Sequence, residues 1–134
     1  MAKARVAETE KITINVGYVD LGQMDLLVDE GFYSNRTDLI RTAIRNELAL
    51  HRDAVRQAVA RRTLVLGLRE FTRHELETVL AAGERLRIHV LGLARIADDV
   101  PAKLAAATIE SVHVLGAFHA SPGVKKALAD RIQS

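Results

Sequence analysis

The stretch Lys11-Ile12-Thr13-Ile14-Asn15-Val16, closed by Gly17, decides the fold of the first part of the chain. Polar and β-branched residues alternate through it without a break, which is typical of a strand with one wet face and one buried face. The polar face carries Lys11, Thr13 and Asn15, and the apolar face carries Ile12, Ile14 and Val16. A lone short strand cannot satisfy its own backbone groups. We therefore expect it to pair with the same segment of a second chain, so that the protein is an obligatory dimer.

Two helices are predicted after this strand. Apolar residues recur at helical spacing over residues 19–30, and Gly31 supplies a C-terminal stop. Asn35 is predicted to cap the second helix, with Asp38 in the place where a capping box carries a carboxylate. Because no Gly or Pro interrupts the following pattern, this helix is predicted to continue to about Arg62 as a connector.

The second half of the chain contains a repeated tripeptide. Its copies are Val65-Leu66-Gly67, Val90-Leu91-Gly92 and Val114-Leu115-Gly116, which are 25 and 24 residues apart. A period of this length is typical of stacked units. We expect parallel strands joined by helices, with each glycine closing a turn. The predicted strands are Leu86–Leu91 and Ser111–Leu115, with Thr63–Leu66 as a third, and the predicted helices are Thr72–Ala82, Asp98–Ala107 and Ser121–Ile132.

The fold class is therefore predicted to be α+β. The expected organisation is a flexible arm at residues 1–10, a strand-helix-helix domain at 11–50, a helical connector at 51–62 and an oligomerisation or effector domain at 63–134. The exposed edges of a short parallel stack favour association between chains.

The strand and the second helix together resemble the ribbon-helix-helix family of CopG-, Arc- and MetJ-like DNA-binding regulators. The resemblance covers about residues 10–50, and its most specific part is the alternating strand followed by Tyr-Ser-Asn-Arg-Thr-Asp-Leu-Ile-Arg at residues 33–41. It implies an intertwined dimer in which two strands form an intermolecular antiparallel β-ribbon that fits the major groove of double-stranded DNA.

The resemblance also assigns roles to residues. The polar strand positions would contact bases: Lys11, Thr13 and Asn15. The turn before the second helix would clamp phosphates, at Ser34, Asn35, Arg36 and Thr37. The dimer core would contain Ile12, Ile14, Val16, Leu27, Leu39, Ile40, Ile44 and Leu48.

Simpler interpretations remain open for these residues. The polar strand residues are also what the wet face of any half-buried strand carries, and Asn35 caps a helix whether or not it meets DNA. Seven arginines lie between residues 36 and 62 and four acids between 20 and 30. This separation of basic from acidic residues indicates one side of the molecule that faces an anion. A solvent-exposed helix with many ion pairs has the same composition.

Three histidines are candidate metal ligands in the sequence: His89, His113 and His119. One subgroup of the family senses nickel through His and Cys ligands, but this chain has no Cys and no closely spaced His pair. His89 and His113 occupy equivalent repeat positions, and with His119 they form the one candidate group for a metal. The alternative, which we prefer, is an outward polar ladder, so we expect no metal and no cofactor.

Composition excludes several other classes. The absence of Cys excludes disulfides and thiolate metal sites, and fits a reducing cytoplasm. No apolar run has the length of a membrane span, and residues 1–10 lack the apolar stretch of a signal peptide. With no Gly-rich phosphate loop and no recognisable nucleophile arrangement, we do not expect an enzyme.

The sequence thus predicts a cytoplasmic, sequence-specific transcriptional regulator, in particular a repressor, that binds DNA as a homodimer or higher homo-oligomer. Two alternatives stay open. One is the antitoxin of a toxin–antitoxin pair, although antitoxin tails are commonly disordered. The other is an oligomerising scaffold for which DNA binding is secondary.

Overall fold

The computed structural model describes residues 9–133, and the chain divides into two compact units at the junction of Gln57 and Ala58. This division falls inside the segment that we expected to be a connector. The expected arm lies mostly outside the described residues, and its last residues, Thr9 and Glu10, are exposed and without regular structure.

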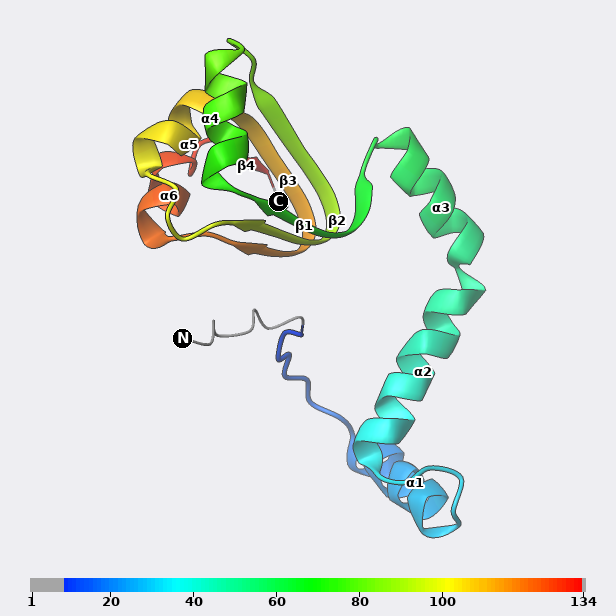
Figure 1. The fold of residues 1–134 in the computed structure, drawn as a ribbon. Helices are drawn as coiled ribbons and strands as arrows, with labels where there is room; N and C mark the ends of the chain where they lie inside the picture. Colours follow the sequence, from blue (N-terminus) through cyan, green and yellow to red (C-terminus); the bar gives the residue numbers. More distant parts are fainter. Residues whose placement is uncertain (1–8, 134) are drawn as a thin grey trace. The chain divides into compact units, whose positions relative to one another are not determined.

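The first unit, Thr9–Gln57, is built from helices. Residues 9–17 have no regular secondary structure, α1 spans Tyr18–Asp29 and α2 spans Arg36–Leu50 (Figure 1). α1 ends at the expected place, because Gly31 adopts a φ of +84° that suits glycine and the chain turns there.

The second helix is not continuous, which corrects one expectation. α2 ends at Leu50, His51 has φ −107° and ψ +17°, and α3 starts again at Arg52 and runs to Arg61. His51 donates its backbone N–H to the carbonyl of Leu48, three residues back, so the regular hydrogen-bond ladder is interrupted at this point. Neither Gly nor Pro marks the break, and nothing in the local sequence explains it.

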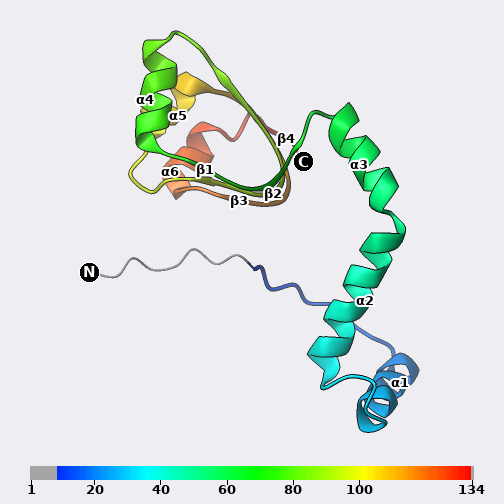
Figure 2. The same ribbon diagram turned by 45° about the vertical axis from the view of Figure 1, so that its right-hand side comes forward.

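The second unit is a parallel sheet with its helices on one side. The order is β1 (Val65–Phe71), α4 (Arg73–Ala81), β2 (Leu86–Ile96), α5 (Ala102–Thr108), β3 (Ile109–His119), α6 (Pro122–Ala127) and β4 (Ile132–Gln133). The strands lie in the order β1-β2-β3-β4 and every neighbouring pair is parallel. The prediction of parallel strands joined by helices is confirmed. Figures 1 and 2 show α4, α5 and α6 together on one side of the sheet.

The core of this unit lies between the sheet and the helices. Alternate strand residues face it, and α4, α5 and α6 with the residue that follows α6 supply the apolar residues opposite. Its largest fully buried side chains are Leu76, Ile88, Val90, Ile96, Ile109, Val112, Val124 and Leu128.

The three Val-Leu-Gly copies lie side by side in this sheet. Val65 pairs with Val90 and Val90 with Val114, and the glycines continue the same register. The expectation that these glycines close turns is wrong, because Gly67, Gly92 and Gly116 lie inside strands. Each has a strongly positive φ, between +118° and +137°. A Cβ on Gly92 would lie 2.1 Å from the carbonyl oxygen of Gly67, and a Cβ on Gly116 would lie 2.0 Å from that of Gly92. Only glycine allows this close approach.

The expected helix boundaries need two further corrections. α5 starts at Ala102 rather than Asp98, because Asp98 and Asp99 form a turn and Pro101 occupies the N-cap position. α6 ends at Ala127, and Ile132 belongs to the short strand β4, which pairs with Val112 and His113 of β3.

Candidate nucleic-acid interface

The segment Lys11–Val16 lies exposed along its whole length. It has no strand partner among residues 9–133, and its apolar side chains are open to solvent: Ile12 is 75% exposed and Ile14 71%. The predicted base-contacting residues, Lys11, Thr13 and Asn15, are exposed as well. A single chain therefore leaves this alternating segment without the hydrogen bonds or the burial that a strand requires.

The rest of the first unit also lacks a core of its own. No residue of the described range Thr9–Gln57 is buried in the single chain. Of the predicted dimer-core residues, only Leu39 is half-buried. The others are exposed: Ile12, Ile14, Val16, Leu27, Ile40, Ile44 and Leu48. An apolar surface on this scale is typical of a segment that folds against a partner.

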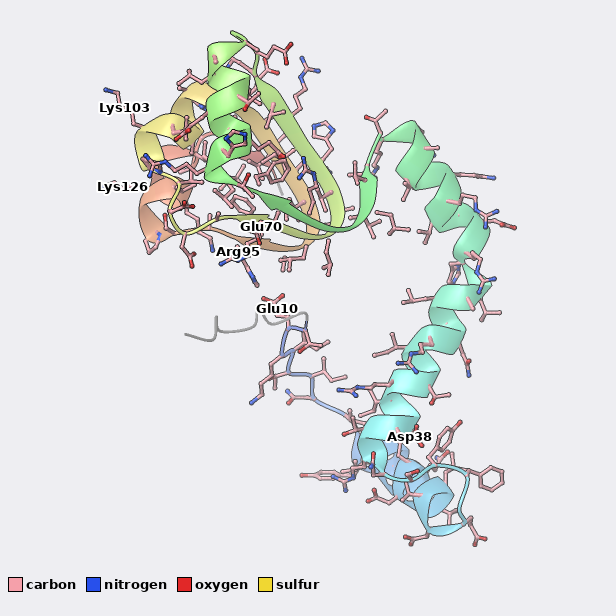
Figure 3. All side chains as sticks on the ribbon, in the orientation of Figure 1. Glu10, Asp38, Glu70, Arg95, Lys103 and Lys126 are labelled. Carbon is pink, nitrogen blue, oxygen red and sulfur yellow. The ribbon has the colours of Figure 1, made fainter. Side chains whose placement is uncertain are left out.

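The start of α2 has the geometry of an anion site. Asn35 caps the helix: its side chain accepts the N–H of Asp38 at 2.8 Å, and the Asp38 carboxylate accepts the N–H of Ser34 at 3.0 Å (Figure 3, where Asp38 is labelled). The predicted cap by Asn35 is therefore present, but the Asp38 carboxylate bonds the N–H of Ser34 and not that of Asn35, so the capping box is not formed in its usual pattern. Among the described residues, no acceptor lies within hydrogen-bond distance of the backbone N–H groups of Asn35, Arg36 and Thr37. These free N–H groups and the positive end of the helix dipole favour an anion.

The guanidinium of Arg36 is held by a residue that sequence reasoning did not single out. Arg36 donates two hydrogen bonds to the Asp25 carboxylate, at 2.7 and 2.8 Å, and so joins α2 to α1. The only sequence signal for this pair was the acidic stretch that contains Asp25. These two bonds use Nε and Nη2, so a DNA phosphate would bind the Arg36 side chain through its remaining N–H groups or by replacing the carboxylate.

This ion pair lowers the pKa of the Asp25 carboxyl from its ordinary value of 3.8, first through the hydrogen bonds from Arg36 and then through its charge. Because the folded-state pKa is depressed, the stabilisation is complete above about pH 4 and is lost as the pH falls through the folded-state value. Asp25→Asn should therefore make thermal stability less sensitive to acid as the pH falls below about 4. Melting curves across this range check it, with Asp29→Asn as the charge-matched control. An identical acid response of wild type and Asp25→Asn would contradict it. The effect is small, because both side chains are about half exposed.

Asn35 allows a cap role to be separated from a DNA role. Asn35→Ala should lower the free energy of unfolding by about 1 kcal/mol, because the cap is lost, whereas Asn35→Asp should retain the cap. Asn35→Asp should nevertheless weaken DNA binding, because it places a negative charge where a phosphate would lie. Chemical denaturation and binding titrations check the two effects. Unchanged DNA binding by Asn35→Asp would exclude this turn from the interface.

The histidines do not come together as a metal site. His89 and His113 are paired across β2 and β3, with ring centroids 6.0 Å apart in an edge-to-face arrangement. His119 is six residues further along β3, which is about 20 Å at the rise of a strand. Among the described residues, no group of three or more His, Cys, Asp or Glu side chains is arranged to hold a metal ion.

Within residues 9–133, no helix combines the length and the apolar character that crossing a bilayer requires.

Comparison with known families gives one match. A family model described as the ribbon-helix-helix transcriptional regulator family matches residues 7–125. The match therefore extends beyond the strand-helix-helix segment through most of the sheet unit. No curated protein and no solved structure matches the chain.

Proposed function

The chain belongs to the ribbon-helix-helix transcriptional regulator family, and on this premise we propose that it is a homodimeric, sequence-specific DNA-binding repressor. Two copies of Lys11–Val16 pair as an antiparallel ribbon, which enters the major groove. The observation that carries the proposal is the exposure of this alternating segment together with the absence of any buried residue in the described range Thr9–Gln57.

Pairing of two chains gives each face of the ribbon a role. Ile12, Ile14 and Val16 turn toward the helices and form a shared core with the exposed apolar residues of α1 and α2. Lys11, Thr13 and Asn15 of both chains then face the bases. Lysine donates to guanine, asparagine bonds adenine through two contacts, and threonine offers a hydroxyl and a methyl group.

The capped start of α2 supplies the second contact with DNA. The unpaired N–H groups of Asn35, Arg36 and Thr37 bind a phosphate together with the hydroxyls of Ser34 and Thr37. Such contacts position the protein on the duplex, while the ribbon selects the sequence.

The sheet unit favours a regulator over an antitoxin. A toxin-binding tail is commonly disordered until it meets its toxin, whereas residues 58–133 have a buried core of their own. In the proposed protein this unit joins dimers and sets the spacing of their half-sites. A regulator of this kind acts in the cytoplasm.

The test starts by selecting the operator from random DNA with the full-length protein. Binding to the selected site and to a scrambled site is then measured at several salt concentrations. The triple variant Lys11→Ala, Thr13→Ala, Asn15→Ala should lose at least about 100-fold in specificity ratio, since each good base contact discriminates by about 1–3 kcal/mol.

The matched control replaces three polar residues of α3 in the same unit with alanine, Arg52, Asp53 and Arg56, and should leave the specificity ratio unchanged. If the ribbon triple variant retained the sequence preference of the wild type, the ribbon would not be the reading element.

A further inference from the structure

The outer edge of β1 is an unprotected apolar edge. Within residues 9–133, β1 pairs on one side only, with β2. Val65, Leu66 and Leu68 of this strand are 57%, 68% and 60% exposed. Soluble proteins usually protect such edges with charges, prolines or a covering segment, because open edges pair with other strands.

The row of glycines shows what this edge is shaped to receive. The place of a Cβ on Gly92 is filled by the carbonyl oxygen of Gly67, and that on Gly116 by the carbonyl oxygen of Gly92. Gly67 has a similar φ of +127°, yet the place of its own Cβ has nothing within 4 Å. The backbone of β1 at Gly67 is therefore shaped like that at Gly92 and Gly116, with room for the glycine carbonyl of one more strand. None of the described residues supplies that strand.

The opposite edge of the sheet offers the matching group. β4 pairs only with Val112 and His113 of β3. Residues Val114–His119 pair with β2 on one side, and among the described residues they have no strand on the other side. Gly116 is the last member of the glycine row. In the repeated register, Val65 of β1 corresponds to Val114, which is the first residue beyond the part of β3 that β4 covers. The part of β3 that β4 leaves open therefore starts where a second copy of β1 would start in this register.

The side chains of the two edges are complementary in the same register. Leu66 would lie beside Leu115, and Glu70 beside His119. Within one sheet, Glu70 already pairs with Arg95 on the next strand at 3.0 Å (Figure 3), and Arg95 is aligned with His119. Adding a second copy continues this row with the Glu70 carboxylate beside the His119 imidazole, whose N–H can donate a hydrogen bond to it, so the edges match in polar as well as in apolar character.

We propose that the sheet continues from β3 of one chain to β1 of a second copy, in parallel and with Gly116 aligned to Gly67. This contact joins two different edges, so it generates a closed ring or an open array rather than a simple two-fold dimer. It is independent of the proposed ribbon and of DNA.

The sequence contains no cysteine, so any disulfide in a cross-linking test comes from the introduced cysteines alone. Within one chain, residues 66 and 115 are separated by β2, about 9.6 Å at two strand spacings, which is beyond the reach of a disulfide. Between copies the proposed contact places them side by side. A full-length chain with Leu66→Cys, mixed with a tagged chain carrying Leu115→Cys, should form a mixed disulfide dimer on mild oxidation. The double variant Leu66→Cys, Leu115→Cys should form a ladder of linked chains.

The control is Leu66→Cys, Leu91→Cys, whose cysteines are paired within one chain and should give no ladder. Absence of the mixed dimer would overturn the proposal. Self-linking of Leu66→Cys alone would also overturn it, because two β1 edges would then pair with each other.

A second measurement does not depend on disulfide geometry. Leu66→Asp, Leu68→Asp replaces two exposed side chains and should leave the circular dichroism unchanged, but remove every species larger than the dimer in sedimentation velocity. Larger species that persist in this variant would overturn the proposal. The variant with Lys11, Thr13 and Asn15 changed to alanine should retain the larger species, which separates this contact from the DNA-reading ribbon.

Discussion

Ile14→Ala is expected to dissociate the dimer and to abolish DNA binding at working concentrations. Ile14 is 71% exposed in the single chain, and the proposed ribbon buries it against the helices of both copies. Truncation of a core isoleucine lowers the free energy of unfolding by about 2–5 kcal/mol. The symmetric dimer contains the substitution twice, so we expect the dimer to lose about 4–10 kcal/mol of stability. Sedimentation equilibrium and melting curves at several protein concentrations measure the effect.

Thr13→Ala is the matched control for this change. It alters the neighbouring residue on the other face of the same strand, so it should weaken sequence recognition but leave dimerisation intact. If Ile14→Ala kept both the dimer and the melting temperature of the wild type, the segment would have no share in the interface.

Gly92→Ala is expected to unfold the sheet unit. The new Cβ would lie 2.1 Å from the carbonyl oxygen of Gly67, at a φ of +137° that alanine rarely adopts. The backbone conformation alone costs about 1–3 kcal/mol, and the clash with main-chain atoms requires the strands to separate. We expect a total loss of more than about 3 kcal/mol, in the range that marks a structural break. Chemical denaturation of the full-length protein measures it.

Gly22→Ala serves as the comparison for Gly92→Ala. Gly22 lies inside α1 and a Cβ there has nothing within 4 Å, so alanine should stabilise the helix by about 0.5–1 kcal/mol. A Gly92→Ala protein with wild-type stability would show that the close approach of strands in the glycine row is not needed.

Local sequence patterns were sufficient to predict the helix ends of most of the first unit. Gly31 and Asn35 mark helix ends by mechanisms that act within a few residues, and both were placed correctly. The link between Asp25 and Arg36 was not predicted, because it depends on how α1 and α2 cross. The interruption at His51 has no glycine or proline signal at all.

The second unit shows what a repeat can and cannot predict. The nearly equal spacing of the three Val-Leu-Gly copies was sufficient to predict parallel strands. The role of the glycines was mispredicted, because glycine weakens an isolated strand and usually marks a turn. In this sheet, glycine is required because the carbonyl oxygen of the glycine on the neighbouring strand fills the place of a Cβ. This close approach of two main chains exists only once the strands are side by side, so the sequence does not show it. β4 is too short to leave a pattern, and its pairing with Val112 depends on the folded sheet.

Ribbon pairing is tested most directly by an isotope-filtered NMR experiment on a mixed dimer of labelled and unlabelled chains. We expect contacts between backbone protons of Lys11–Val16 in one chain and the same segment in the other, in an antiparallel pattern. Contacts of this segment only with other parts of its own chain, or no contacts between chains, would contradict it.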